Sequence, residues 1–508
     1  MRVRQIFSPK FARSFARGSK RNREQTVKTL RRWLLYVGLW PFFLLAQERV
    51  RYQTDFPPEE FAARRAKIFE KIGERALAVI QGAPAVNGFK VFRQSNEFYY
   101  LCGIETPHAY LLLDGRTRKT TLYLPHRDEQ RERNEGKVLS AEDADLVKQL
   151  TGIDAVRPLE MMPRDWIWSS LVRLPAPAIY TPFSPSETEA DSRDESLSGN
   201  AGIAADPWDG RPTREGHFIH LLRTRYPQFE IRDLSPLLDE MRLIKSPREI
   251  ALIRRATQLA GLGLMEAMRC SAPGVYEYQL DAAARYIFQI NGARREGYPS
   301  ITAGGANAWL GHYFHNSDAL QDGDLVLMDY APDYRYYTSD IARMWPVNGK
   351  FTPAQRELCG FILAYRNTLL KHIRPGVSAN QIMDECAAVM EKYLNSATFS
   401  KPIHAKACRE ALKFRGHLSH PVGMAVHDVG DYKKSLLQPG MVFSIDPMIW
   451  IPEEKQYVRI EEVVAVTETG VENFSDFVPA ELDEIENLMK EEGVLQKRPA
   501  SPMPITSP

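Results

Sequence analysis

Cysteine is scarce in this 508-residue chain, and its scarcity excludes two kinds of structural support. The five cysteines are odd in number and no two stand in CxxC spacing, so neither a disulfide framework nor a zinc–thiolate site is expected. They are Cys102, Cys270, Cys359, Cys386 and Cys408. Hydrophobic residues make up 44% and charged residues 26%, which excludes a wholly disordered, collagenous or polytopic membrane chain. The length predicts two or three domains.

The chain also has little net charge, and that charge is unevenly placed. The formal net charge is +2, yet residues 1–32 hold eleven Lys and Arg against one acid, Glu24. That segment carries +10 and leaves −8 for the other 476 residues. Because nucleic acid is not attracted to a mildly acidic body, we expect no nucleic-acid partner.

No apolar run reaches the length of an ordinary membrane span. Residues 33–46 are fourteen uncharged, mostly apolar residues, whereas roughly 20 are needed to cross a bilayer. Following a basic segment, this run is typical of a signal peptide cleaved after Ala46, which predicts a periplasmic or secreted protein. Arg31-Arg32 loosely resembles a twin-arginine signal. The alternatives are an uncleaved anchor that contacts the membrane and a basic extension of a cytoplasmic protein.

Residues 54–235 are predicted to form an amino-terminal mixed α/β domain. The spacing of apolar residues predicts a helix over 57–74, and four short apolar runs predict strands. The predicted strands are 76–80, 98–101, 110–113 and 120–124. Residues 183–215 are rich in Ser, Asp, Glu, Gly and Pro, so we expect a polar surface loop or insertion there.

A second domain is predicted over residues 236–480, followed by a tail over 481–508. Capping boxes with proline at the first helical position predict two helix starts, at Ser246-Pro247-Arg248-Glu249 and at Thr352-Pro353-Ala354-Gln355. The predicted strands are 325–329 and 334–343, joined by a turn at 331–333, and then 441–446 and 458–467. The tail is expected to hold a short charged helix and a disordered Pro/Ser end.

Four acids stand at or near the ends of apolar strands in this second domain. They are Asp329, Asp340, Asp446 and Glu461. A carboxylate buried at such a place needs a partner or a metal ion. With His417, His420 and His427 nearby in the sequence, the oxygen-rich set suits Mn²⁺, Co²⁺, Fe²⁺ or Zn²⁺ in a paired site. Each residue alone is more simply interpreted as a turn cap or an ion-pair partner, so the prediction depends on the order of the whole set.

That order resembles the pita-bread metallopeptidases, a family that includes aminopeptidase P, prolidase and methionine aminopeptidase. The motifs are Asp329-x₁₀-Asp340, Ser419-His420-Pro421-Val422-Gly423, His427-Asp428-Val429-Gly430, Asp446-Pro447 and Arg459-Ile460-Glu461. Residues 346–357 resemble aminopeptidase P in particular, and residues 92–101 resemble the amino-terminal domain that it shares with prolidase. The implied fold class is α/β (α+β), with an amino-terminal mixed α/β domain and a carboxy-terminal pita-bread domain.

The resemblance implies a site for two divalent metal ions, with Mn²⁺ as the first candidate and Co²⁺, Fe²⁺ or Zn²⁺ as alternatives. Asp329 would hold one ion, and Asp340 would bridge both. His420 and Asp446 would bind the second ion, and Glu461 would bridge. The implied reaction is hydrolysis of the amide bond before proline, in peptides with proline at the second position. We also expect a homo-oligomer.

The resemblance implies roles for further residues around the metals. His312 would contact the substrate, His427 would steady the tetrahedral intermediate, and Arg459 would orient a carboxylate. Asp446 would carry a proton from the attacking water to the leaving proline nitrogen. That nitrogen belongs to a tertiary amide and has no hydrogen of its own.

The chain departs from the family pattern at three places. The family usually has Glu where Asp446 stands, and proton transfer needs a heavy-atom distance of about 2.6–3.2 Å, so metal binding is predicted more firmly than catalytic rate. Pro421 replaces a common aromatic residue. Gly416-His417 reverses a His-Gly order, so we expect no substrate-binding role for His417.

Other functions remain open on the sequence alone. Prolidase, which acts on Xaa-Pro dipeptides, differs from aminopeptidase P in the loops that close the site. A non-catalytic peptide-binding relative usually lacks several ligands, whereas all five ligand positions are filled in this chain. A creatinase-type amidinohydrolase shares both domains but lacks the acidic set.

Overall fold

The computed structural model describes residues 52–86, 88, 90–167, 177–189, 191–433 and 435–497. The predicted signal segment and the end of the predicted tail lie outside these ranges. Of the helices inside them, none combines the length and the hydrophobicity that a bilayer crossing requires. Internal contacts divide the chain into residues 1–54 and 55–508, and the elements named next all belong to the second unit.

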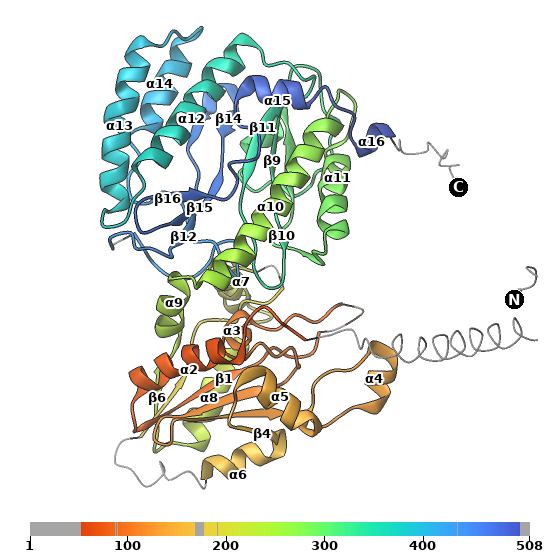
Figure 1. Ribbon diagram of the computed structural model, residues 1–508, viewed down its shortest axis with the longest axis vertical. Helices are drawn as coiled ribbons and strands as arrows, with labels where there is room; N and C mark the ends of the chain where they lie inside the picture. Colours follow the sequence, from red (N-terminus) through yellow and green to blue (C-terminus); the bar gives the residue numbers. More distant parts are fainter. Residues whose placement is uncertain are drawn as a thin grey trace, which may run out of the picture. The chain divides into compact units, whose positions relative to one another are not determined.

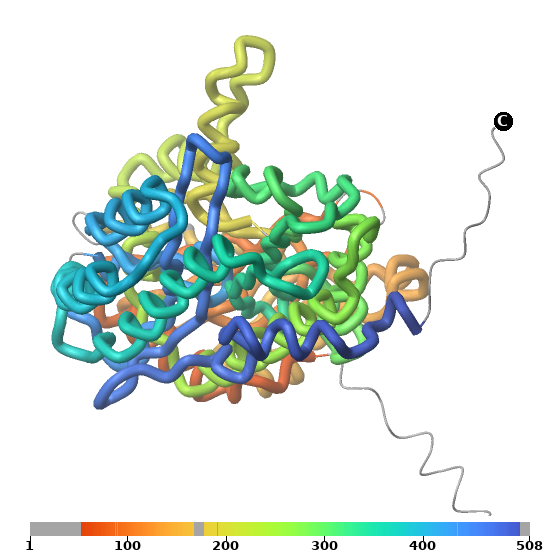
Figure 2. Tube along the Cα trace, turned by 90° about the horizontal axis from the view of Figure 1, so that it is seen from above, coloured from red at the N-terminus to blue at the C-terminus, as the bar shows by residue number. Residues whose placement is uncertain are grey.

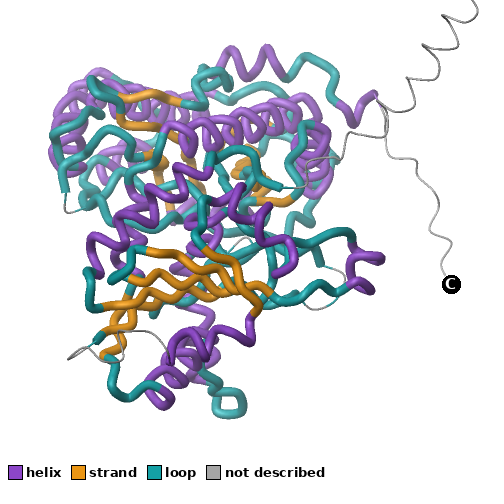
Figure 3. The backbone as a smooth tube through the Cα atoms, turned by 60° about the horizontal axis from the view of Figure 1, so that its bottom comes forward, coloured by secondary structure: helices purple, strands orange, loops and turns teal. Residues whose placement is uncertain are grey.

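A six-stranded mixed sheet forms the centre of the amino-terminal half (Figure 3). Its order is β4-β3-β2-β1-β5-β6, antiparallel among β1, β2 and β3 and parallel at the other three pairs. The strands are β1 (Ala76–Gln81), β2 (Tyr110–Asp114), β3 (Lys119–Leu124), β4 (Ala155–Pro158), β5 (Ala178–Thr181) and β6 (Glu230–Asp233). The helices are α2 (Pro58–Ile72), α3 (Asn96–Cys102), α4 (Glu129–Glu135), α5 (Ala144–Thr151), α6 (Met162–Ile167), α7 (Arg193–Ala205), α8 (Arg214–Arg225) and α9 (Ser235–Leu243).

Apolar side chains on one face of this sheet hold the half together. Leu77 and Val79 of β1 pack with Ile179 of β5 in a buried cluster that Trp166 of α6 and Leu222 of α8 complete. Alternate residues of a strand point to the same face, so one register of pairing brings all the strand members of this cluster together.

The carboxy-terminal half contains two antiparallel three-stranded sheets, β11-β9-β8 and β12-β15-β16, and the pairs β13–β14 and β10–β7. The strands are β7 (Arg295–Glu296), β8 (Ile301–Gly304), β9 (Leu325–Asp329), β10 (Pro332–Asp333), β11 (Ala342–Pro346), β12 (Val442–Ile445), β13 (Met448–Ile451), β14 (Gln456–Arg459), β15 (Glu462–Val466) and β16 (Val471–Asn473). The helices are α10 (Pro247–Cys270), α11 (Glu277–Ile290), α12 (Pro353–His372), α13 (Ala379–Ser396), α14 (Pro402–Ala411), α15 (Leu482–Leu488) and α16 (Val494–Lys497). Helices α12, α13 and α14 lie on one side of the strands and α10 and α11 on the other (Figure 1).

The two three-stranded sheets meet where the acidic strand ends lie. Asp329, the last residue of β9, is opposite Ala342 of β11. The backbone of Ala342 also exchanges hydrogen bonds with Glu461, which lies between β14 and β15, at N···O distances of 3.1 and 3.3 Å. Backbone pairing alone therefore holds Asp329 and Glu461 close to the same residue, Ala342.

Several predicted elements are confirmed, and two predictions in the amino-terminal half are wrong. The predicted strand 98–101 is helix α3, which starts after the extended Ser95 and ends at Gly103 in the left-handed conformation, with φ 66°. All seven residues of α3 are buried, so the apolar run has no period that separates helix from strand. Residues 183–215 contain α7 and the start of α8, and Figure 2 shows the chain around α7 (yellow) standing out from the molecule.

Two strands of the carboxy-terminal half are also shorter than predicted. The predicted strand 334–343 begins too early: β11 starts at Ala342, and the residues before it turn through Arg335 and Tyr336, whose φ values are positive. The predicted strand 458–467 is broken into β14 and β15 at Ile460 and Glu461. Both predicted capping boxes form, at the starts of α10 and α12.

Candidate metal centre

Three of the predicted ligands come together in space. One ligand atom from each of Asp340, His420 and Glu461 lies within 4.8 Å of the others. Asp340 precedes β11, Glu461 interrupts the run from β14 to β15, and His420 lies in the loop before β12. That loop is held by a 2.9 Å backbone hydrogen bond from Ser444 of β12 to the carbonyl of His420. The distance from His420 Nε2 to Asp340 Oδ2 is 3.1 Å.

The other two predicted ligands are joined to this cluster through Arg459. The guanidinium group forms an ion pair with Asp329, lies 3.3 Å from Asp446 Oδ2, and lies 3.6 Å from Glu461 Oε2. All four carboxylates are buried or nearly so. The structure therefore brings the five predicted ligands into one centre, with Arg459 as the counter-charge among the acids.

Burial sets the proton affinities of these carboxyl groups. It raises the pKa of Asp329 to about 7, with Asp340 adding to the shift and Arg459 opposing it. Burial, with Asp340 and Asp446 as like-charged neighbours, also holds the pKa of Glu461 well above its usual value. Burial works the same way on Asp340, but the hydrogen bond from His420 prevails and lowers its pKa to about 2. The four carboxyl groups of the centre thus face one guanidinium, that of Arg459, and one imidazole, that of His420. The centre therefore has less positive than negative charge.

The donor set fits divalent cations. Asp446 Oδ1 and Glu461 Oε2 are buried without a hydrogen-bond partner, and a buried carboxylate oxygen that accepts no hydrogen bond is costly. His420 Nδ1 lies 3.2 Å from the carbonyl of Pro421, which can only accept, so Nδ1 carries a hydrogen. Nε2, which faces Asp340, would offer its lone pair to a cation once it gives up its own hydrogen. Oxygen donors with one imidazole are ligands for Mn²⁺, Co²⁺, Fe²⁺ or Zn²⁺.

Two of the three other predicted histidines lie beside the centre. The ring centroid of His427 is 4.2 Å from that of His420, and 6.3 Å from that of His312. Burial lowers the pKa of His312, helped by His427 and Arg459. His417 packs instead against Phe414, with ring centroids 4.9 Å apart, so the structure does not bring it to the ligands.

Two contacts of the centre were not predicted. The Tyr298 hydroxyl lies 2.6 Å from Asp329 Oδ1 and 2.9 Å from Asp340 Oδ1. Asp194, from the segment predicted as a surface loop, contacts His427 at 2.8 Å. The sequence around Tyr298 has little that would mark it as a contact of the centre. The turn that contains Asp194 is marked, because Ser192 and Glu195 form a capping box at the start of α7.

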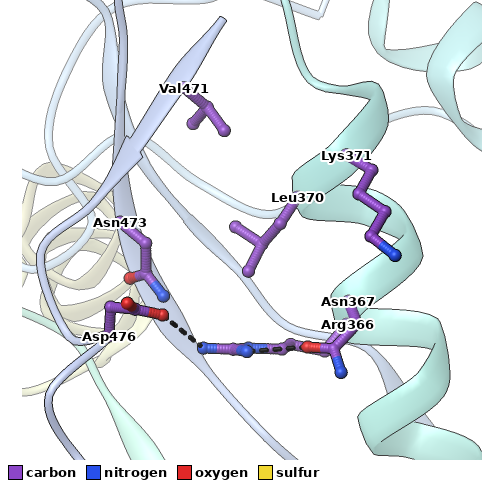
Figure 4. A pocket seen from close by; sticks show the side chains of 7 residues that line it. All are labelled: Arg366, Asn367, Leu370, Lys371, Val471, Asn473 and Asp476. Carbon is purple, nitrogen blue, oxygen red and sulfur yellow. Dashed lines mark hydrogen bonds and ion pairs between the residues drawn. The ribbon is translucent and has the colours of Figure 1, made fainter.

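A separate hollow of about 440 Å³ lies between α12 and β16 and is polar (Figure 4). Its lining contains Arg366 and Lys371, with Asp476 at 3.9 Å from Arg366. Arg366 also reaches inward to Glu462, the neighbour of Glu461 in sequence. The hollow is therefore linked to the metal centre through Arg366 and Glu462. None of the predicted metal ligands lines it.

Comparisons with known proteins identify the family of the chain. A model of metallopeptidase family M24 matches residues 251–468, and one of the aminopeptidase P N-terminal domain matches residues 61–166. The chain is 32% identical to the Xaa-Pro aminopeptidase of Haemophilus influenzae over 466 residues, 86% of this chain and 99% of that protein. It is 29% identical to the mitochondrial intermediate cleaving peptidase 55 of Arabidopsis thaliana over 452 residues, 85% of this chain and 83% of that protein.

A solved structure gives the same result for the fold. Proline aminopeptidase P II from Yersinia pestis aligns with a TM-score of 0.69 and 30% identity, over 86% of this chain and 100% of that one. The predicted fold class, an α/β (α+β) chain with a pita-bread domain, is confirmed. The chain belongs to metallopeptidase family M24, in the branch that carries the aminopeptidase P amino-terminal domain.

Proposed function

We propose that this chain is a metal-dependent aminopeptidase that releases the amino-terminal residue of peptides with proline at the second position. The observation that carries the proposal is the meeting of Asp340, His420 and Glu461 within 4.8 Å, in a chain of this family. The substrate class comes from the relatives, which include Xaa-Pro aminopeptidases.

The five ligands would hold two divalent metal ions, with Mn²⁺ as the first candidate and Co²⁺, Fe²⁺ or Zn²⁺ as alternatives. Asp329 would hold one ion, His420 and Asp446 the other, and Asp340 and Glu461 would serve both. When bound, the ions lower the pKa of a water molecule and polarise the scissile carbonyl. Arg459 and Tyr298 orient the carboxylates by the contacts described above.

Asp446 is the residue that we propose for proton transfer. Its Oδ1 atom is buried without a hydrogen-bond partner, while Oδ2 is held by Arg459 at 3.3 Å. Burial raises the pKa of this carboxyl, although Arg459 opposes the shift, so Oδ1 is a better proton acceptor than an exposed carboxylate. The proton then passes to the proline nitrogen, which leaves only when it is protonated.

His312 and His427 are proposed to hold the peptide. His427 lies beside His420 and would steady the tetrahedral intermediate. Because the pKa of His312 is lowered, we expect its ring to be neutral at pH 7. A neutral ring can hydrogen-bond to the peptide without repelling its positively charged α-amino group.

Hydrolysis of three substrates, together with metal analysis, tests the proposal. We expect cleavage of a longer peptide with proline second, and little cleavage of the same peptide with alanine second or of Gly-Pro. EDTA should abolish activity, and Mn²⁺ or Co²⁺ should restore it. Full activity in metal-free protein contradicts the proposal. Cleavage of Gly-Pro alone indicates a prolidase, and peptide binding without cleavage by the metal-loaded protein indicates a non-catalytic relative.

Asp340→Asn should be among the most damaging single changes, because a ligand that serves both ions cannot be replaced by its neighbours. We expect metal content per chain to fall and activity to drop by at least about a hundredfold. Elemental analysis and a peptidase assay on the same sample measure both. Asp209→Asn, an exposed surface acid far along the chain from the ligands, is the matched control. A fully metal-loaded Asp340→Asn variant would argue against the bridging role.

We further propose that the protein acts outside the cytoplasm, after cleavage of an amino-terminal signal. The support is the basic segment followed by the apolar run at residues 33–46. Mass spectrometry of the native protein should find a chain that begins near Gln47. An intact segment in a soluble cytoplasmic fraction contradicts this proposal, and an intact segment in the membrane fraction indicates an anchor.

A homo-oligomer is the assembly that we propose for the native protein. Light scattering on the purified protein should give a mass at least twice that of one chain. A mass of about 58.0 kDa or below contradicts the proposal.

A further inference from the structure

His427 is held by the first turn of α7, an element of the amino-terminal half. Its Nδ1 atom lies 2.8 Å from Asp194 Oδ2, and its backbone N–H donates to Ser192 Oγ at 3.1 Å. Both contacts come from the polar stretch of residues 183–215. Two successive anchors, one on the ring and one on the backbone, fix the position and the rotation of one imidazole.

The first turn of α7 is itself fixed by buried charges. Arg193, between the two contact residues, forms ion pairs with Glu97 at 2.6 Å and with Glu187 at 3.1 Å. Arg242 pairs in turn with Glu187 at 2.7 Å and with Asp428, the residue after His427. The two sides of the contact are therefore anchored to the same buried network.

The contact with Asp194 decides which nitrogen of His427 is free. An ionised carboxylate only accepts hydrogen bonds, so Nδ1 must carry the hydrogen. Nε2 is then the nitrogen available on the side of the ring that does not face Asp194. The ring centroid lies 4.2 Å from that of His420 and 6.3 Å from that of His312, so the ring whose tautomer Asp194 sets lies beside the metal centre.

We propose that Asp194 is a positioning residue for the hydrolytic reaction: it holds the His427 imidazole in one tautomer and one orientation beside the metal centre. The inference rests on the proposed role of His427. The polar stretch of residues 183–215 then takes part in the reaction, because the first turn of α7 completes a site that is otherwise built from the carboxy-terminal half.

A purely structural role for the pair is disfavoured by exposure. The Asp194 side chain is 61% exposed, and ion pairs at such places contribute little to stability. Removal of the carboxylate should therefore leave the fold intact. Any large kinetic effect would then have to come from the orientation of His427.

A double-mutant cycle on the metal-loaded protein tests the proposal. Asp194→Ala, Asp194→Asn, His427→Ala and the double variant Asp194→Ala/His427→Ala are compared in kcat, KM, metal content and thermal midpoint. Asp209→Ala, the same chemical change at the far end of the same segment, is the control. Asn keeps a carbonyl oxygen that can accept from Nδ1–H, whereas Ala does not.

We expect Asp194→Ala to lose about ten- to hundredfold in kcat with little change in KM, metal content or thermal midpoint. Asp194→Asn should recover part of the loss, Asp209→Ala should lose nothing, and the double variant should be no slower than His427→Ala. Wild-type kcat in Asp194→Ala overturns the inference. So does additive loss in the double variant, or activity that falls in proportion to metal content. Wild-type kcat in His427→Ala would instead overturn the proposed role of His427.

Discussion

At the scale of single residues, Asp446 stands where the resemblance to the family predicts a glutamate. The residue follows directly on β12, whose last member, Ile445, pairs with Glu462 of β15. The backbone there is fixed by the sheet, and Oδ2 is held by Arg459 at 3.3 Å. Since the acid, the strand and the guanidinium are fixed together, we interpret the shorter side chain as an adaptation of the site.

Two substitutions at this position test that interpretation. Asp446→Glu adds a methylene to a buried carboxylate cluster, so we expect kcat to fall by about tenfold. Asp446→Asn keeps the size and removes the proton acceptor, so we expect a loss of about a hundredfold or more. Both are measured as kcat on an Xaa-Pro peptide at saturating Mn²⁺.

The opposite outcomes have distinct meanings. Faster hydrolysis by Asp446→Glu would indicate that the chain has drifted from catalysis toward binding. Equal rates for the wild type and Asp446→Asn would remove Asp446 from the proton-transfer step. Metal content, measured on each variant, separates a lost proton acceptor from a lost ligand.

The chemistry of the centre was visible in the sequence only where a side chain contradicts its local pattern. Asp329 and Asp446 close apolar strands, and such a mismatch can be read without a structure. Tyr298 and Asp194 could not be found this way. A tyrosine and an aspartate in polar surroundings are ordinary until the fold brings them 2.6 and 2.8 Å from Asp329 and His427.

At the scale of elements, β15 supports the metal centre through a buried ionic cluster. Glu462, its first residue, lies 2.9 Å from Arg343 of β11 and 2.7 Å from Arg366 of α12. The Ser475 hydroxyl also donates to it. All three charged side chains are at least nine-tenths buried, so each depends on the others for compensation.

Glu462→Gln should therefore be strongly destabilising. It leaves two buried arginines without their shared counter-charge, and we expect the free energy of unfolding to fall by about 3–5 kcal/mol. Urea denaturation followed by circular dichroism measures the change. The matched control is Glu472→Gln on β16, an exposed residue whose partner Arg254 is 2.8 Å away and partly exposed. There we expect less than about 1 kcal/mol, and equal losses would contradict the prediction.

The elements that could be predicted are those whose burial leaves a period in the sequence. Helix α2 buries one face, including Phe61, Ile68 and Ile72, and its span was predicted closely. Helix α3 is buried on every side and has no such period, so its apolar residues predict a strand instead. Helix α7 exposes most of its residues, and only its capping box marks it.

At the scale of the whole described unit, one buried network ties the two halves of residues 55–508 together. Glu97 of α3 and Glu187 belong to the amino-terminal half, and Asp428 belongs to the carboxy-terminal half. Arg242 of α9 contacts all three, with distances of 3.8 Å to Glu97 and 2.7 Å to Glu187. Its neighbours Arg193 and Lys245 add further positive charge, so the network sets both the contact between the halves and the position of His427.

This network predicts how stability depends on pH. Burial raises the pKa of Glu97 to about 7, with Glu187 adding to the shift and Arg193 and Arg242 opposing it. In the unfolded chain the same carboxyl group has a pKa of about 4.3, so between those two values the folded chain binds the proton that the unfolded chain has lost. Stability from this group is therefore highest at low pH and falls as the pH rises to about 7, by at most about 4 kcal/mol.

Glu97→Gln isolates that contribution, because glutamine resembles the protonated acid and does not titrate. Urea unfolding of the wild type and the variant at pH 5, 6, 7 and 8, with Mn²⁺ present throughout, gives the difference in unfolding free energy at each pH. Groups common to both proteins cancel in that difference. We expect the unfolding free energy of the variant to rise relative to that of the wild type from pH 5 to pH 7. The difference should level off by pH 8. A difference that stays constant across this range would show that Glu97 is already ionised in the fold at pH 5, and that the cationic neighbours Arg193 and Arg242 outweigh its burial.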